Sequence, residues 1–487
     1  MCKTTSFRIS DIRACFGFRI SCFEFFQGML SPMSPRFLQP LLSQKRLAGG
    51  AMVLAITQLL ASVAGLFRDR ILASTFPPGL DPLDTVSVYI AAFRPSDFLF
   101  QMFIMSAFSV ALVPLLASHL AKGRQEEMDR LLTSTLLIAS LFFGILALLL
   151  TFFFGDLAPY LVDFTGERLQ LYIHFGKLAC FTNFLFVSGN AFGQYLITKQ
   201  TYWAYGITPV LYTLGTIAGT IFLSPIVGPY GPLYGSILGA LIYVWVRFAV
   251  VLMQGFSMRL SFRSLFHPEL FEMGWLMLPR MMALGAVQGE LLLFDKVASG
   301  LEIGSVTINA YARNFQSAVV GVIGIALAQS AYSLLSQAAA SGDLQRFQSY
   351  IKKGTLLVLG LSIPAAILLY LLGEIAADIV NLEDAKVIST FTIALGIYAL
   401  SIPFENLNHL LLRGSYATKH TTIPAVLSVL NGFSGIAVAW YFAPEYGVYA
   451  LAGGFLVGQV LHLVFLALFL KVRLRNLSSA WGGVPRL

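Results

Sequence analysis

The chain is a succession of long apolar stretches separated by short polar loops. A stretch of about 20 residues crosses a hydrocarbon core of ~30 Å as a helix, because each residue adds about 1.5 Å. The apolar residues run continuously and do not alternate with polar ones, which argues against a β-barrel. We therefore expect an all-α polytopic membrane protein of about twelve transmembrane helices. The predicted spans are 47–67, 86–118, 131–154, 169–197, 205–224, 232–254, 273–294, 305–338, 354–373, 386–412, 421–442 and 447–470.

The polar loops alternate in charge. Lys and Arg gather in the tails and in every second loop, as at Arg124, Lys352 and Lys353, whereas Asp156 and Glu302 typify the loops between. Basic loops mark the cytoplasmic side of a membrane protein. The pattern predicts a multi-pass protein with both termini cytoplasmic, which requires an even number of spans.

The two halves of the sequence resemble each other. Ala91-Ala92-Phe93-Arg94 returns 219 residues later as Ala310-Tyr311-Ala312-Arg313, and Gly123 returns as Gly342 at the same offset. Upstream, Asp69-Arg70-Ile71 resembles Asp295-Lys296-Val297. Two similar six-helix bundles in the same orientation are typical of a transporter with its substrate cavity between them. The predicted domains are a basic cytoplasmic tail at 1–46, bundles at 47–255 and 273–470, a cytoplasmic linker at 256–272 and a cytoplasmic tail at 471–487.

Composition narrows the class of protein. Of the 487 residues, 57% are hydrophobic and 11% are charged. A soluble domain carries roughly 25% charged residues, so the composition argues against a soluble multidomain enzyme and excludes a disordered chain. The sequence holds no phosphate-binding loop, nucleophile motif or metal-ligand spacing. We expect no catalytic residue, no enzyme activity, no cofactor, no metal and no nucleic-acid partner, with membrane potential or an ion gradient as the driving force.

Several arginines fall inside the predicted spans. A charge near the bilayer centre costs at least ~2.5–3.5 kcal/mol on insertion scales, so each one needs a reason. Arg68, Arg94 and Arg313 could point into the cavity and clamp an anion, because a guanidinium keeps its charge and donates two parallel hydrogen bonds. They could instead reach the membrane surface or form internal ion pairs. Both interpretations stay open, and the repeat relation of Arg94 to Arg313 favours the first.

A second set of ionisable residues lies in or beside the spans: Asp69, Asp97, Glu290, Glu405 and His409. We expect these residues to be candidates for ion coupling, since a carboxylate in a membrane can carry a proton or hold a cation. Glu405 and His409 are four residues apart and share a helix face. Structural hydrogen bonds are the alternative interpretation.

Several motifs carry a resemblance to a known family. Gly65-Leu66-Phe67-Arg68-Asp69, Ala92-Phe93-Arg94-Pro95 and Ser106-Ala107-Phe108-Ser109 are similar to the N-terminal signature of the MurJ/MviN family, within the MOP exporter superfamily. Its members flip lipid II, the undecaprenyl-pyrophosphate-linked peptidoglycan precursor, across the bacterial inner membrane. The resemblance implies that Arg68 and Arg313 belong to a cationic cavity for the pyrophosphate, with Arg94 where the family often has Lys or Arg.

The sequence also departs from that family. Ser62 and Phe100-Gln101 stand where the family has cavity arginines, and Met105 replaces an acid. We expect the family's two additional C-terminal helices to be missing. Three alternatives therefore remain beside lipid II flipping: a flippase for another lipid-linked oligosaccharide, a MOP drug or cation antiporter, and a non-transporting membrane scaffold. The expected partners are a lipid-linked anionic precursor, bilayer lipids and cell-wall synthesis or division proteins.

Overall fold

The structure is a computed structural model that describes residues 47–75, 81–258, 267–418, 420 and 422–481. Every regular element in these ranges is a helix, so the all-α prediction is confirmed. The predicted tail at 1–46 and the middle of the linker at 256–272 lie outside the described residues.

The first half of the chain forms one group of packed helices. α7 packs on α8, while α11 packs on both α8 and α9, and α4 lies along α9. The elements in order are α4 (Leu47–Thr75), α5 (Pro82–Leu99), η2 (Phe100–Met105), η3 (Phe108–Leu112), α6 (Val113–Ala121), α7 (Gln125–Leu161), α8 (Gly166–Thr198), α9 (Tyr202–Ala218), η4 (Gly219–Leu223), α10 (Ser224–Val227), η5 (Gly228–Tyr230) and α11 (Gly231–Met253).

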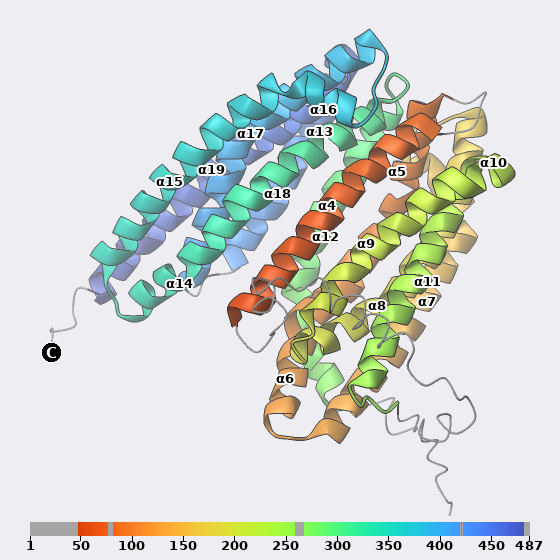
Figure 1. The fold of residues 1–487 in the computed structure, drawn as a ribbon. Helices are drawn as coiled ribbons and strands as arrows, with labels where there is room; N and C mark the ends of the chain where they lie inside the picture. The colour runs from red at the N-terminus through yellow and green to blue at the C-terminus, as the bar shows by residue number, and fades with distance from the viewer. Residues whose placement is uncertain (1–46, 76–80, 259–266, 419, 421, 482–487) are drawn as a thin grey trace, which may run out of the picture.

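The second half forms a neighbouring group (Figure 1). α19 packs on α17 and α18, and α15 packs on α17. α12 contacts α18 in its own half and α5 in the other, so it joins the two groups. The exact domain boundaries stay a prediction. The elements are α12 (Glu269–Ser299), α13 (Ser305–Val320), η7 (Gly321–Ile325), α14 (Ala326–Ala340), α15 (Leu344–Leu371), α16 (Gly373–Ile379), α17 (Ala385–Ala417), α18 (Thr422–Tyr446) and α19 (Val448–Trp481).

The helices are long enough for a membrane. Among the described residues, 9 helices have the length and hydropathy to span a bilayer, or up to 10 if the bent α12 counts as one span. α12 bends by 51° between Glu269–Trp275 and Arg280–Ser299, a break that contains Pro279. The multi-pass prediction is therefore confirmed, whereas the number twelve stays a prediction.

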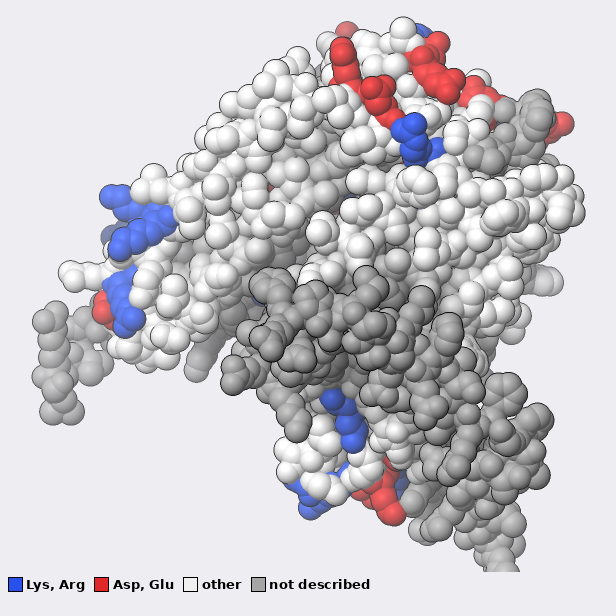
Figure 2. Space-filling model, viewed as in Figure 1, with Lys and Arg blue, Asp and Glu red and all other residues white. Residues whose placement is uncertain are grey.

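Charged side chains gather at the two ends of the helices. Acidic side chains lie at the end that carries α16, and Lys and Arg side chains mark the opposite ends of both groups (Figure 2). Glu302, Glu374 and Glu383 are exposed at the first end, and Lys122 and Lys353 at the other. The charges thus lie at the ends of the helices, as the alternating loop charges predict.

The second helix of each half is wound irregularly at matching places. η2 and η7 are π-helical, and a shift by the repeat offset places Gly321 on Met102. A π-helical turn holds more residues than an α-helical one and is frequent at functional sites. The irregular winding is therefore shared at η2 and η7, whereas the residues that correspond to η3 lie in the regular α-helix α14.

Glycines bring α9 and α11 into close contact. A Cβ atom at Gly215 on α9 would lie 2.5 Å from the Cα of Gly239, and one at Gly219, the first residue of η4, would lie 2.4 Å from the Cα of Gly235. No side chain fits at these positions without moving a backbone. Small residues of this kind allow close packing of helices in membranes.

Candidate functional site

Arg94 forms an ion pair across the two groups of helices. Asp81 caps the start of α5, accepting hydrogen bonds from the amides of Leu83 and Asp84, and the helix carries Arg94 inward in its last turns. The Nε of Arg94 donates to Oδ2 of Asp295 on α12 at 2.8 Å. The Asp295 side chain is only 4% exposed, so this pair is largely shielded from water.

Arg68, on α4, lies beside the boundary between the two groups of helices, called the seam below, and pairs with its neighbour Asp69. Its Nε and Nη2 donate to Oδ1 of Asp69 at 3.0 and 2.6 Å. The buried Tyr311 hydroxyl donates to the Asp69 carbonyl oxygen at 3.1 Å, which ties α4 to α13. Asp69 therefore serves both an ion pair and a contact between the halves.

Arg313, unlike the other two arginines, makes no hydrogen bond to a carboxylate among the described residues. Its Nη1 lies 3.9 Å from Oε1 of Glu290, which is within ion-pair range but too long for a hydrogen bond. That nitrogen is buried and finds no hydrogen-bond partner among the residues that the structure describes. The guanidinium lies 4.5 Å from the ring centroid of Phe455 and 6.0 Å from that of Phe294, within cation–π range.

Glu405 and His409 continue the polar region on α17. Gln316 on α13 donates to Oε2 of Glu405 at 2.6 Å and to the Ser401 hydroxyl at 3.2 Å. The Nε2 of His409 lies 4.0 Å from Oε1 of Glu405, as their shared helix face predicts. Glu405 also lies close enough to Arg313 to interact with its charge.

Asp97 belongs to a different network. It accepts a hydrogen bond from the Asn183 side chain at 2.7 Å, and the same amide donates to Ser96 at 2.6 Å. The structure thus places Glu290 and Glu405 near Arg313 and His409 beside Glu405, while Asp97 and Asp69 lie with the helices of the first half. The binding and coupling roles of all these residues stay predictions.

The pairing of Asp295 with Arg94 was not predicted from the sequence. The sequence places Asp295 in or near a span, but its pairing with Arg94 depends on how α5 and α12 face each other. One signal was available, since Asp295 matches Asp69 in the repeat, and both carboxylates bind a seam arginine. The interpretation of the arginines as members of internal ion pairs therefore describes part of what they do.

The seam is held together at one end of the helices. The hydroxyls of Ser87 on α5 and Thr307 on α13 lie 2.8 Å apart, and both are buried. Lys296, beyond Arg94's partner on α12, donates to Asp163 at 2.5 Å. At the other end of the span formed by α13, η7 and α14, α14 packs on α15 and α17, and the two groups diverge there (Figure 1).

No metal site accompanies these charges. Across the described ranges, no three His, Cys, Asp or Glu side chains come together to hold a metal ion. The chemistry that the seam offers is ionic, with three arginines, each beside a carboxylate.

This arrangement defines the class of protein. Repeated helical groups that meet around buried charges are typical of secondary membrane transporters. The fold matches an inward-facing multidrug resistance MATE transporter of the MOP superfamily with a TM-score of 0.76, at 12% identity, covering 88% of this chain and 99% of the other. It also matches an inward closed structure titled lipid II flippase MurJ with a TM-score of 0.72, at 21% identity, covering 88% and 90%.

The chain belongs to the lipid II flippase MurJ family, whose sequence model matches residues 83–482. Among similar proteins, a probable lipid II flippase MurJ of Bdellovibrio bacteriovorus is 23% identical, covering 88% of this chain and 83% of the relative. The lipid II flippase MurJ of Burkholderia cenocepacia is 22% identical, covering 87% and 83%. The resemblance stated from the sequence motifs is confirmed.

Proposed function

We propose that this protein translocates a polyprenyl-pyrophosphate-linked cell-wall precursor, lipid II, across the bacterial inner membrane for peptidoglycan biosynthesis. Family membership and the names of the relatives support this function, and the ionic seam supports an anionic substrate. In this proposal both termini are cytoplasmic, in keeping with the basic ends of the helices. The product is delivered to enzymes that polymerise it, so cell-wall synthesis or division proteins are its expected partners.

The state of Arg313 carries the proposal. A buried guanidinium nitrogen without a hydrogen-bond partner is costly, because a charged donor loses its hydration on burial. A pyrophosphate oxygen is an acceptor of the right charge, and two of its oxygens match the fork of a guanidinium. The substrate would thus supply the partner that Nη1 lacks among the described residues.

The carboxylates beside the arginines supply the other half of the mechanism. While no substrate is bound, Glu290 and Asp295 neutralise Arg313 and Arg94. A pyrophosphate that engages the arginines competes with these acids, which can then take up a proton or a cation. Membrane potential or an ion gradient would drive the rocking of the two groups, because substrate and coupling ion alternate at the same charges.

An apolar groove beside the seam fits the part of the lipid tail nearest the pyrophosphate. It has a volume of about 540 Å³ and lies between α5, α7 and α12. Pro95 and Gly289, each next to a seam charge in the sequence, line it together with Leu150 and Leu293. The exposed Leu149 and Phe153 open it towards the membrane. We propose that the polyprenyl chain lies here while the pyrophosphate reaches Arg94.

Complementation tests the proposal. The wild-type gene is expected to rescue a strain depleted of its own lipid II flippase, and Arg313→Ala is expected to fail. Arg280→Ala is the matched control, because Arg280 lies on α12 with an exposed side chain and should rescue. Both variants must be present in the membrane at wild-type levels. Equal rescue by Arg313→Ala would refute the role of this arginine.

A direct assay separates flipping from the alternatives. Purified protein in vesicles should make labelled lipid II accessible on the opposite leaflet, and Arg313→Ala should not. Transport of a cationic drug without any flipping would instead support an antiporter. Rescue that survives loss of every seam arginine would support a scaffold.

A further inference from the structure

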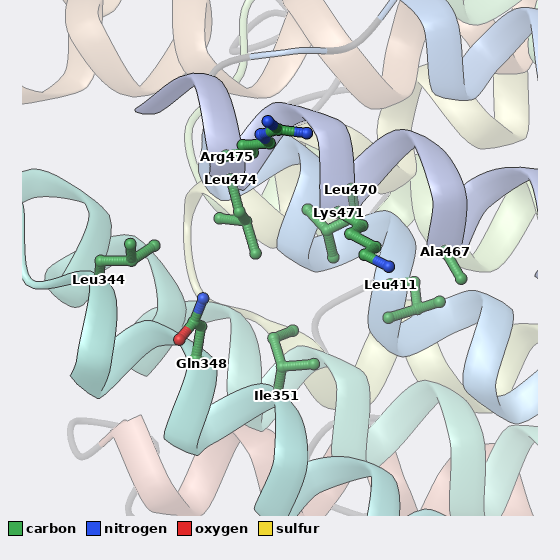
Figure 3. Close-up of a pocket in the computed structure, with 9 residues that line it drawn as sticks. All are labelled: Leu344, Gln348, Ile351, Leu411, Ala467, Leu470, Lys471, Leu474 and Arg475. Carbon is green, nitrogen blue, oxygen red and sulfur yellow. The ribbon is translucent and has the colours of Figure 1, made fainter. Parts of the chain in front are cut away.

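A separate hollow lies on the outer side of the second group of helices. It has a volume of about 460 Å³, within the ~300–1,000 Å³ range of ligand pockets. Figure 3 shows side chains from α15, α17 and α19 around it. Its lining consists of Leu344, Gln348, Ile351, Leu411, Ala467, Leu470, Lys471, Leu474 and Arg475.

The hollow is apolar with two cations at one side. Leu411, Leu470 and Leu474 are buried and form its floor, while Ala467 is exposed. Lys471 and Arg475 are four residues apart on α19, so both project from one face of the helix. Both lie near the end of the apolar stretch Val448–Leu477, where a span reaches the headgroup layer.

We propose that this hollow, named here the α15–α19 trough, binds an anionic phospholipid. An acyl chain lies on the leucine floor, and the phosphate is held by Lys471 and Arg475. Basic pockets between membrane helices at the headgroup layer are suited to acidic lipids. Gln348 on the opposite wall can donate hydrogen bonds to the same headgroup.

The position of the trough favours a lipid over a soluble anion or a peptide. The same helices expose Leu356 and Leu357 on α15 and Val464 and Leu468 on α19. Exposed apolar side chains along a span face hydrocarbon. A molecule that enters between such helices therefore comes from the bilayer and carries an apolar chain.

The trough is distinct from the proposed substrate site. It shares no residue with Arg68, Arg94 or Arg313, and it lies on the outer side of α17, the helix that carries Glu405. A lipid seated there would link α15 to α19 and stabilise the packing around α17. The proposal goes beyond flipping and does not depend on it.

Native mass spectrometry of the purified full-length protein tests the site. The probes are phosphatidylglycerol and phosphatidylcholine with identical acyl chains. We expect phosphatidylglycerol to bind more tightly, and K471Q/R475Q to weaken it about 25-fold, since each basic side chain near a membrane surface contributes about fivefold. Phosphatidylcholine binding should not change.

Two further variants keep the test decisive. K352Q/K353Q removes two exposed charges at the same end of α15 outside the trough and should leave binding unchanged. Ala467→Trp fills the exposed wall and should weaken both lipids while the circular dichroism spectrum stays helical. Equal affinity for the two lipids, unchanged binding by K471Q/R475Q, or an equal loss in K352Q/K353Q would overturn the proposal.

Discussion

The ion pair between Arg94 and Asp295 predicts an unequal cost for losing either partner. At 2.8 Å and an effective dielectric constant of about 20, two unit charges attract by ~6 kcal/mol. Desolvation offsets much of this attraction, because removing each ion from water costs several kcal/mol. The intact pair therefore contributes little to the free energy of folding, whereas one buried charge left without its partner lowers stability strongly.

The two single substitutions should differ because their partners differ in exposure. Arg94→Met leaves Asp295, which is 4% exposed, as a buried unpaired charge, at a cost of about 3–5 kcal/mol. Asp295→Asn leaves Arg94, which is 22% exposed, with water and an amide oxygen as acceptors, so this variant should lose at most about 1.5–3 kcal/mol. The double variant should be more stable than Arg94→Met alone.

Unfolding by SDS titration of the purified variants measures these differences. Helicity is followed by circular dichroism, and the four proteins close a double-mutant cycle with an expected coupling of at least ~2 kcal/mol. Free energies of unfolding that simply add in the double variant would refute the reasoning, because additivity means that the two charges do not sense each other.

Three further predictions concern packing and the seam. Arg247→Met should lower the free energy of unfolding by about 1–3 kcal/mol, as measured by SDS titration, because the Thr208 hydroxyl and two carbonyl oxygens lose the buried donor that they share. Gly235→Leu should lower the thermal unfolding midpoint, because its Cβ would meet the backbone of α9. Gly155→Ala, where a Cβ has open space, should leave the midpoint unchanged or raise it, since alanine favours a helix over glycine by about 0.5–1 kcal/mol. Ser87→Cys with Thr307→Cys should cross-link under oxidant and stop lipid flipping until a reductant is added, and flipping by the cross-linked protein would contradict the role of this contact.

The helices could be predicted from the sequence because a membrane span leaves a local signature. Length and continuous hydropathy identify a span without knowledge of its neighbours, as α7 and α17 illustrate. The repeated Arg94 and Arg313 were also visible, since equal offsets need no structure. These features depend on residues close together in the chain or on direct comparison of its halves.

Pairing between helices could not be predicted in the same way. The partner of Arg94 lies 201 residues away on α12, and the choice depends on the rotation of both helices. The α15–α19 trough draws its walls from three helices that no sequence motif connects. Arg247 is the opposite case, because this buried arginine has no partner among the described residues of the other half. Its hydrogen bonds go to Thr208 and the Gly189 carbonyl oxygen, both in the first half.

The matched winding of η2 and η7 has a consequence for how the two halves tolerate change. The offset of 219 residues holds before these segments, at Arg94 and Arg313, and after them, at Gly123 and Gly342. Both copies thus contain the same number of residues between the arginine and the loop glycine. One residue added to or removed from either copy would turn one arginine by about 100° relative to the helix below it. Selection should therefore remove single-residue insertions and deletions in these segments more often than substitutions of the same residues.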